Sequence, residues 1–295
     1  MTARVRDVIA SATRQLAEAG VESPRVDAEH LVAHALRTDR GRLVVVDEMT
    51  DTQHAAVTDL VSRRADREPL QHILGDAAFG PLTLAVGPGV FVPRPETELL
   101  LEWAVQACTA AAPSPRVVDL CSGSGALALG VAALTDATVV AVEKDDDALT
   151  WLRRNVAATP ESRLRRVDVR HGDATTLDWR RDSDGAVDVV VSNPPYVPTT
   201  VDVPPEVADH DPAIAVFGGR DGMSVITPMA AVVAAILAPG GRCAIEHDDT
   251  TADRVTAALD GTDAFDEITS HTDLSGRPRF VTARRRSDAA ARMRQ

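Results

Sequence analysis

The stretch RVVDLCSGSGALALGVAAL, residues 116–134, decides the fold class of this chain. An apolar run ends at Asp119 and Leu120, a short loop of glycine and serine follows, and an apolar segment of helical composition starts at once. Glycines in such a loop allow the backbone to approach a ligand closely, and the N-terminus of the next helix offers free N–H groups. The stretch predicts a strand, a ligand-binding loop and a helix in immediate succession.

The same alternation of strand and helix repeats on the C-terminal side. Apolar, β-rich runs occur at TVVAVE (138–143), RRVDVRHGD (165–173), VDVVVSNPPY (187–196) and GRCAIEH (241–247). Helical patterns lie between them, at DDALTWLRRNV (146–156) and MAAVVAAIL (229–237). Repeated strand–helix–strand units with right-handed crossovers build a parallel sheet with helices on both faces. We therefore expect an α/β fold with a doubly wound, mostly parallel sheet.

The N-terminal part of the chain has a helical pattern up to about Arg67. Apolar residues recur there at helical spacing, and Ser23–Pro24 and Asp51–Thr52 are typical of helix starts. Glycine and proline then interrupt short β-like pieces as far as Pro95. We expect a small helical domain at residues 1–76, a connector that can form a β-hairpin at 77–95, the α/β domain at 96–284 and a disordered tail at 285–295.

The composition excludes several classes of protein. The formal net charge is -13 and Lys144 is the only lysine, whereas proteins that bind nucleic acid backbones need clustered basic residues. No apolar run has the length of a membrane span, and the N-terminus lacks the apolar region of a signal peptide. The cysteines have no metal-ligand spacing, and His30 and His34 lack a third ligand. We expect a cytoplasmic protein that uses no metal, no membrane and no direct contact with nucleic acid.

Carboxylates end three of the expected strands. Asp119 ends the first, Glu143 ends the second about twenty residues later, where doubly wound folds present a carboxylate to ribose hydroxyls, and Asp173 follows the third. This pattern predicts a nucleoside ligand. Ala128 stands where a dinucleotide-binding motif has its third glycine, and no phosphate-binding lysine follows the loop. A nucleoside without a long phosphate chain remains, and S-adenosylmethionine fits.

The fourth strand ends in Asn193, Pro194, Pro195 and Tyr196, the only tyrosine. The side-chain carbonyl of Asn193 and the backbone carbonyl of Pro194 are two acceptors that suit one planar NH2 group. The prolines restrict both residues to extended conformations, so the acceptors are held in place before a substrate arrives. Tyr196 can provide an aromatic wall for the planar group. The segment predicts methyl transfer to an amide or an exocyclic amine.

At these residues the sequence resembles the peptide chain release factor glutamine methyltransferases, the HemK/PrmC family of class I S-adenosylmethionine enzymes. The resemblance runs from the helical domain to about Arg284. Besides NPPY at 193–196, the similar segments are RVDAEHLVAHAL (25–36), REPLQHILG (67–75), FVPRPETE (91–98), DLCSGSGALAL (119–129) and IEH (245–247).

The resemblance implies a class I methyltransferase fold, with the helical domain at residues 1–76 recognising the substrate. It implies methyl transfer from S-adenosylmethionine to the N5 amide of the glutamine in the Gly-Gly-Gln loop of class I release factors. The implied cofactor-binding residues are Asp119, Cys121, Ser122, Gly123, Ser124, Gly125, Glu143, Asp173, Ala174 and Asn193. The implied catalytic and substrate-binding residues are Asn193, Pro194, Pro195 and Tyr196, with Phe91 and Arg94 bordering the glutamine pocket.

Three positions depart from the family pattern. Cys121 replaces the first glycine of the loop, so a positive φ there would strain the turn. Ala174 offers no ring to stack on adenine, and Asp248 follows Glu246–His247 where the family usually has glycine. Arg94 can alternatively serve in a surface ion pair.

NPPY alone leaves other functions open. An adenine-N6 methyltransferase acting on DNA or RNA has nearly the same acceptor chemistry, although the net charge of -13 disfavours it. A cofactor-binding protein without catalysis is a third reading, which the intact NPPY disfavours. A methyl-transfer assay on candidate substrates separates the three.

Overall fold

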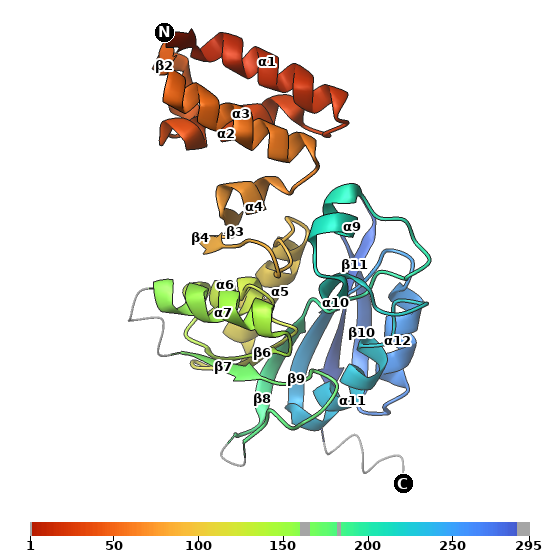
Figure 1. The fold of residues 1–295 in the computed structure, drawn as a ribbon. Helices are drawn as coiled ribbons and strands as arrows, with labels where there is room; N and C mark the ends of the chain where they lie inside the picture. The colour runs from red at the N-terminus through yellow and green to blue at the C-terminus, as the bar shows by residue number, and fades with distance from the viewer. Residues whose placement is uncertain (1, 160–165, 182–183, 288–295) are drawn as a thin grey trace. The chain divides into compact units, whose positions relative to one another are not determined.

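A computed structural model describes residues 2–159, 166–181 and 184–287 of the chain (Figure 1). It divides into two compact units, Met1–Asp76 with Pro204–His210, and Ala77–Val203 with Asp211–Gln295. The sequence did not indicate that residues 204–210 associate with the helical unit. The expected tail at 285–295 lies outside the described residues from 288 onward, and the last strand runs to Arg285.

The smaller unit is helical. Its elements are β1 (Thr2–Arg4), α1 (Val5–Glu18), α2 (Pro24–Leu36), the 3-10 helix η1 (Arg40–Val45), β2 (Glu48–Thr50), α3 (Asp51–Ala65), α4 (Leu70–Leu74) and α9 (Pro205–His210). The predicted start of α2 is confirmed, with Pro24 in its first turn. Helix α3 begins at Asp51 because Thr50 and Gln53 form a reciprocal capping box. The apolar faces of these helices meet in one core that includes Leu16, Leu31 and Met49.

An ion-pair network fixes residues 204–210 within this unit. Arg64, which is buried, donates to Asp27 at 2.8 Å and to Glu206 at 3.0 Å. Arg67 donates to both oxygens of Glu206, at 2.8 and 2.6 Å. Burial alone would raise the pKa of Glu206, but the bonds from Arg67 and Arg64 lower it to about 2. Glu206 is therefore a charged anchor for α9.

The larger unit contains the central sheet. Its elements are β3 (Asp76–Phe79), β4 (Leu82–Ala85), α5 (Thr97–Ala111), β5 (Arg116–Leu120), α6 (Ala126–Leu134), β6 (Thr138–Glu143), α7 (Asp146–Ala158), β7 (Val167–His171), β8 (Val187–Ser192), α10 (Ala213–Val216), α11 (Ile226–Ile236), β9 (Leu237–Glu246), α12 (Ala252–Asp260), β10 (Phe265–Thr272) and β11 (Pro278–Arg285). The connector contains β3 and β4, which pair with each other.

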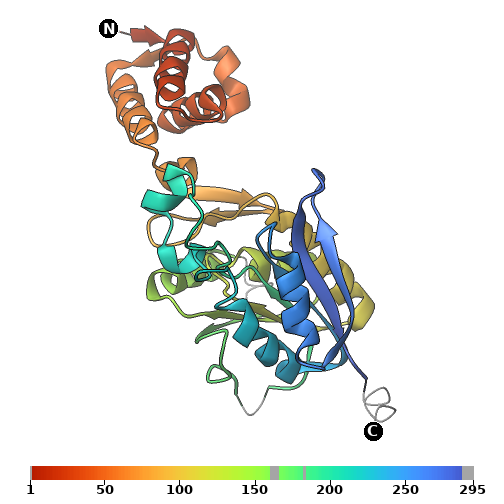
Figure 2. The same cartoon turned by 90° about the vertical axis from the view of Figure 1, so that its right-hand side faces the viewer.

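The seven strands of the sheet have the order β10-β11-β9-β8-β5-β6-β7. The five strands from β7 to β9 are parallel, whereas β11 is antiparallel to β9 and β10 is antiparallel to β11. The long hairpin of β10 and β11 is drawn in blue in Figure 2. The predicted doubly wound, mostly parallel sheet is confirmed.

Each face of the sheet has its own core. Val117 and Val189 pack on one face with side chains of α5, α6 and α7, such as Leu100, Leu129 and Leu152. Val118 and Val190 pack on the other face with side chains of α11 and α12, such as Met229 and Leu259. Strands covered on both faces need continuous apolar runs, which explains the sequence pattern that reveals them.

The strand order reverses between β5 and β8, because β6 and β7 follow on one side of β5 and β8 returns on the other. Doubly wound sheets bind ligands at such a switch point, beyond the carboxyl ends of the strands. The glycine loop (residues 121–125) follows β5, and the NPPY segment (residues 193–196) follows β8. Across the described ranges, we find no helix that could cross a membrane and no cluster of metal ligands.

Candidate active site

The glycine loop connects β5 to α6 through a series of left-handed backbone conformations. Cys121, Gly123 and Gly125 have φ angles of 61°, 54° and 89°. Cys121 therefore carries the strain expected for a non-glycine residue at this position, about 1 kcal/mol. A Cβ atom added to Gly123 would meet no heavy atom within 4 Å, whereas one on Gly125 would lie 2.6 Å from Leu152. The side chain of Leu152 thus packs closely against the loop at Gly125, whereas the space beside Gly123 is open.

Glu143, at the end of β6, is held by three backbone N–H groups. Its Oε2 accepts from Gly123 at 2.8 Å, and its Oε1 accepts from Lys144 and Asp145, both at 2.8 Å. Burial raises the pKa of Glu143, and these hydrogen bonds oppose that rise. The carboxyl group thereby joins the glycine loop to the end of β6, with its orientation fixed before any ligand binds.

Asp119 is the second-last residue of β5 and is 1% exposed. Its Oδ2 accepts from the N–H of Ala128 at 3.1 Å, while its Oδ1 has no hydrogen-bond partner within the described residues. Burial raises its pKa to about 7. Asp119 therefore holds the first turn of α6 by a buried hydrogen bond. It is not the solvent-exposed residue that an isolated aspartate at a strand end usually is.

Asp173 follows β7 and is engaged by two neighbours. Its Oδ2 accepts from Nζ of Lys144 at 3.0 Å, and its Oδ1 accepts from the N–H and the hydroxyl of Thr175 at 2.8 and 2.7 Å. The contact with Lys144 joins the ends of β6 and β7, and sequence reasoning missed it. Ala174 is buried in the same apolar cluster as Trp179.

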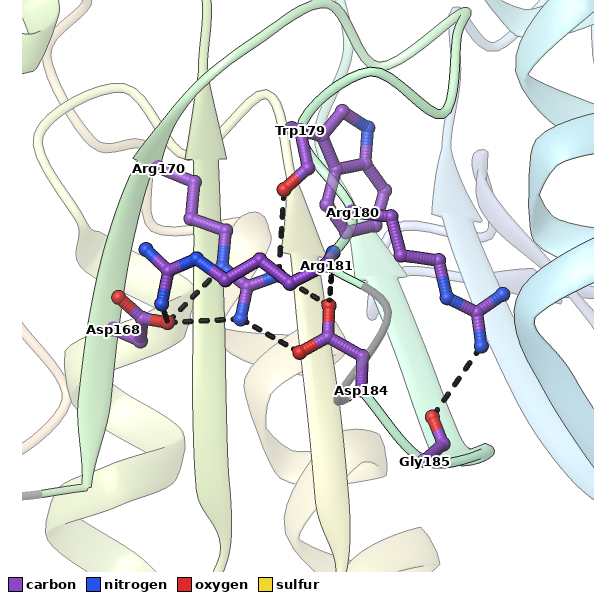
Figure 3. Close-up of polar contacts among 7 residues, drawn as sticks. All are labelled: Asp168, Arg170, Trp179, Arg180, Arg181, Asp184 and Gly185. Carbon is purple, nitrogen blue, oxygen red and sulfur yellow. Dashed lines mark hydrogen bonds and ion pairs between the residues drawn. The ribbon is translucent and has the colours of Figure 1, made fainter.

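An ion-pair network holds the segment that follows Asp173 against β7 (Figure 3). The guanidinium of Arg170, with only 6% of the side chain exposed, donates to both oxygens of Asp184, to Oδ2 of Asp168 and to the carbonyl of Trp179. Arg181 donates to the same oxygen of Asp168 from a side chain that is 60% exposed. The hydrogen bonds from Arg170 lower the pKa of Asp184 to about 2. This network fixes the loop on which Asp173 and Ala174 lie.

The NPPY segment is held by side chains from two other elements. Nδ2 of Asn193 donates to Oγ1 of Thr97 at 3.1 Å, and the Tyr196 hydroxyl donates to Oε1 of Glu246 at 3.0 Å. Pro194 and Pro195 are buried. Motif spacing could not reveal Thr97 and Glu246 as partners, because they come from α5 and β9, far away in the sequence.

Backbone contacts also fix this segment. The N–H of Val197 donates to the carbonyl of Val216 at 3.0 Å, and the N–H of Gly218 donates back to the carbonyl of Val197 at 2.9 Å. A Cβ atom on Gly222 would lie 2.3 Å from the carbonyl oxygen of Tyr196. Only glycine fits at 222, and the glycines at 218–222 were the unused sequence signal for this approach.

Phe91 and Arg94 lie in the stretch before α5. Nη2 of Arg94 bonds Oδ2 of Asp211 at 2.7 Å, and its guanidinium lies 4.8 Å from the centre of the Phe91 ring. The Asp211 side chain is fully buried, so this is an ion pair with a buried carboxylate and not a surface pair. Burial and Glu246 raise the pKa of Tyr196, and the charge of Arg94 acts in the opposite direction.

The structure thus brings together two groups of the predicted residues. The glycine loop, Glu143 and Asp119 form one group around the end of β5. The NPPY segment forms the other, and the Ser192 hydroxyl, which donates to the carbonyl of Leu120 at 2.7 Å, connects the ends of β8 and β5. Asp173 is linked to the first group through Lys144.

The strand order, the glycine loop and NPPY beside the switch point define a class I methyltransferase. Solved structures with this fold include a methyltransferase from Pyrococcus furiosus, with a TM-score of 0.50 and 15% identity over 70% of this chain and 90% of that chain. The 16S rRNA N2 G1207 methyltransferase of T. thermophilus, solved with AdoMet and guanosine, has a TM-score of 0.50 and 24% identity over 72% of this chain and 50% of that chain.

Sequence comparison places the chain more narrowly. The family described as PrmC N-terminal domain matches residues 7–75, and the one described as Conserved hypothetical protein 95 matches residues 79–208. A curated relative from Mycolicibacterium smegmatis, named Release factor glutamine methyltransferase, is 54% identical over 96% of this chain and 98% of its own length. Relatives of the same name from Mycobacterium tuberculosis H37Rv and Corynebacterium glutamicum are 46% and 48% identical, each over 95% of this chain and over 91% and 98% of their own lengths. The chain belongs to the release factor glutamine methyltransferase family.

Proposed function

We propose that this chain transfers a methyl group from S-adenosylmethionine to the N5 amide of the glutamine in the Gly-Gly-Gln loop of class I peptide chain release factors. The proposal rests on the position of the NPPY segment. The segment follows β8 at the switch point of the sheet, and Thr97 accepts a hydrogen bond from the side-chain NH2 group of Asn193. Family membership supports the choice of substrate. Because release factors act on ribosomes, we infer that the chain works in the cytoplasm.

The residues around the end of β5 fit the nucleoside part of S-adenosylmethionine. The space beside Gly123 is open, the Glu143 carboxyl is fixed by three N–H groups, and one buried oxygen of Asp119 has no partner in the described structure. Glu143 would accept from the ribose hydroxyls, because an ionised carboxylate is a strong acceptor. When bound, the cofactor supplies an electrophilic methyl group on a sulfonium.

The remaining cofactor contacts follow from position in the fold. The glycine loop, with Cys121, Ser122, Gly123, Ser124 and Gly125, would approach the cofactor through its backbone. Asp119 would hold the start of α6 behind the loop through its bond from the N–H of Ala128. Asp173 and Ala174, beside the third parallel strand, would border the adenine. Asn193 would border both the cofactor and the substrate.

The NPPY segment would bind the substrate amide. An amide nitrogen is a poor nucleophile because its lone pair is delocalised into the carbonyl. The Oδ1 of Asn193 and the carbonyl of Pro194 would accept its two hydrogens and align the nitrogen with the methyl group. Tyr196 would form the wall beside the planar group together with Pro195, and Phe91 and Arg94 would border the pocket of the glutamine side chain.

Substitution of Asn193 tests this function. Asn193→Ala should lower turnover by about 10²–10³, with little change in cofactor affinity, because it removes one preorganised polar contact at the reacting centre. The turnover of Asn193→Asp should lie between those of the parent and of Asn193→Ala. Aspartate keeps an acceptor oxygen, but it adds a negative charge that stabilises the cationic cofactor in its ground state.

The measurement is mass spectrometry of release-factor peptides after incubation with labelled S-adenosylmethionine, with calorimetry of cofactor binding as the control. A parental rate in Asn193→Ala contradicts the assigned acceptor geometry. DNA and RNA oligonucleotides assayed in parallel test the adenine-N6 alternative, and label incorporated only there contradicts the proposed substrate.

A further inference from the structure

Hydrogen bonds extend from both ends of the NPPY segment into the larger unit. At one end, Asn193 donates to Oγ1 of Thr97 at 3.1 Å, and the backbone N–H of Thr97 donates to the carbonyl of Arg94, also at 3.1 Å. At the other end, the N–H of Val197 donates to the carbonyl of Val216 at 3.0 Å, and Val216 is the last residue of α10. The two series of contacts therefore lead to Arg94 and to α10.

An ion pair between Arg94 and Asp211 joins these two series. Asp211 lies two residues before the start of α10, and its Oδ2 accepts from Nη2 of Arg94 at 2.7 Å. The Asp211 side chain is fully buried, whereas 34% of the Arg94 side chain is exposed. A buried carboxylate needs a cation or hydrogen-bond donors close by, so the guanidinium of Arg94 is held where Asp211 lies. The ion pair thus closes a chain of contacts that starts and ends at the NPPY segment.

Two contacts fix the guanidinium of Arg94 in orientation. The Asp211 carboxylate binds one of its nitrogens, and the centre of the Phe91 ring lies 4.8 Å from its central carbon. A guanidinium has five N–H donors in one rigid plane. Within the described ranges, Asp211 is the one hydrogen-bond acceptor of the Arg94 side chain. The remaining donors of this partly exposed group are therefore available to a ligand.

The proposed reaction indicates which acceptor these donors suit. The glutamine amide needs its lone pair on nitrogen to attack the methyl group, and a cation bonded to the amide oxygen would draw that lone pair away. The backbone carbonyls beside the glutamine take no part in the reaction, and they accept charge-assisted hydrogen bonds. Two glycines precede the glutamine in the Gly-Gly-Gln loop, and without side chains they leave its backbone open to such an approach.

We propose that Arg94 binds backbone carbonyls of the substrate loop and that Asp211 is the positioning residue that aims the Arg94 guanidinium at them. This inference rests on the proposed function and deepens it, because it names the part of the substrate that Arg94 contacts. It also assigns a role to Asp211, which lies between the NPPY segment and α10 and belongs to neither.

Arg94→Met tests the contact in the full-length chain, with full-length release factor and labelled S-adenosylmethionine. KM for release factor should rise about 10- to 100-fold, because charge-assisted hydrogen bonds to the substrate are lost. The value of kcat should stay within about threefold of the parent, since a backbone contact is the same in the ground state and the transition state. A loss of kcat at parental KM would overturn the proposal.

Asp211→Asn tests the positioning role. Asparagine keeps the shape of the side chain and an acceptor oxygen but lacks the charge, so KM should rise about 3- to 10-fold with little change in kcat. If Asp211 acts through Arg94, Asp211→Asn should add less than about twofold to the KM of Arg94→Met. Fully multiplicative increases in KM would show that Asp211 acts independently of Arg94 and would overturn its role.

Asp266→Asn is the matched control. It removes the charge of another carboxylate that pairs with an arginine, Arg284, at 3.0 Å. Arg284 lies opposite Arg242, whereas Phe280 lies opposite Glu246 at the end of β9, so this ion pair is displaced along the sheet from that end. Asp266→Asn should keep the parental KM and kcat.

Melting temperatures and kinetics together separate positioning from a merely structural role. Partial unfolding reduces the amount of active enzyme and so lowers the apparent kcat, whereas a misplaced guanidinium raises KM. A lowered melting temperature of Asp211→Asn with a lowered kcat and a parental KM would therefore assign Asp211 a structural role only. A parental chain that transfers no label to release factor contradicts the proposed function, and the inference fails with it. An active parent beside a parental KM in Arg94→Met contradicts the inference alone.

Discussion

At the scale of single residues, the site combines buried carboxyl groups with very different surroundings. Glu143 accepts three backbone hydrogen bonds, Asp119 accepts one, and Glu246 accepts from a tyrosine hydroxyl. Burial raises the pKa of each of them. The chemistry of each group therefore depends on its partners and not on its residue type.

Glu143→Gln should weaken binding of S-adenosylmethionine about 10- to 150-fold, because a charge-assisted hydrogen bond contributes about 1.5–3 kcal/mol. Glutamine is a milder test than alanine, since it keeps one of the two acceptor oxygens, whereas alanine would leave the N–H groups of Gly123, Lys144 and Asp145 all without an acceptor. The measurement is calorimetry, and Glu102→Gln on the exposed face of α5 is the control. Unchanged affinity in Glu143→Gln would remove Glu143 from the cofactor site.

Asp119→Asn should alter the pH dependence of stability. The folded-state pKa of Asp119, about 7, is above its ordinary value of 3.8, so the folded state favours the protonated carboxyl. Its contribution to the free energy of unfolding is thus fully present below about pH 4, declines as pH rises to about 7 and is constant above. Between pH 4.5 and 8, the free energy of unfolding should therefore fall by about 1–4 kcal/mol less in Asp119→Asn than in the parent. The measurement is urea unfolding of the cofactor-free protein. Parallel curves for the two proteins would contradict this account.

The sequence predicts members of the candidate site but not the side chains that contact them. Asn193, Glu143 and the glycine loop belong to short motifs whose chemistry is local. Thr97, Lys144, Asp211 and Glu246 act through contacts that the fold creates, and no spacing rule predicts which side chains from distant parts of the sequence meet. Cys121 shows the same limit, since its left-handed conformation follows from the turn and not from the residue.

At the scale of elements, periodic segments were predictable and irregular ones were not. The strands β5, β6 and β8 have continuous apolar runs because both faces of the sheet are covered, and that requirement is visible in the sequence. The segment after NPPY contains α9 and α10, both short and without a strong apolar period. Its place depends on Glu206 and on backbone contacts with Val197, which only the folded chain reveals.

The loop that follows β7 gives a prediction at this scale. Arg170→Met should lower the free energy of unfolding by about 2–4 kcal/mol, because Asp184 and Asp168 keep their charges without the shared buried partner. Arg181→Met is the matched control and should cost less than about 1 kcal/mol, since that arginine is mostly exposed. Urea unfolding measures both, and equal losses would contradict the role of Arg170 as the central residue of the network.

At the scale of the whole molecule, the chain passes from the larger unit into the helical unit and back between residues 203 and 211. The helical spacing of apolar residues predicted a continuous N-terminal domain and could not predict this second segment, which holds its place through one carboxylate and two arginines. The helical unit contains more acidic residues than arginines, which suits a protein partner better than a nucleic acid.

A chain of residues 77–295 with Glu206→Gln should bind S-adenosylmethionine with an affinity within about threefold of the parent. Its kcat/KM for release factor should fall at least about a hundredfold, because binding energy from contacts remote from the reacting amide is used to orient the substrate. The substitution is needed since truncation removes the partners of Glu206, Arg64 and Arg67. The full-length Glu206→Gln variant is the control, and methylation and cofactor calorimetry are the measurements. Parental methylation by a soluble truncated chain would show that the helical unit has no part in recognition.

The single lysine has a practical consequence. Lys144 is the chain's one side-chain amine, half of its side chain is exposed, and it follows Glu143 directly. An amine-reactive fluorophore therefore labels one side chain, beside the proposed ribose site, without any engineering of the sequence. Acylation also removes the positive charge that Asp173 now pairs with, so the labelled protein carries its dye next to a carboxylate released from its ion pair. The same atom that joins the ends of two strands is thus a built-in attachment point for an optical reporter of ligand occupancy.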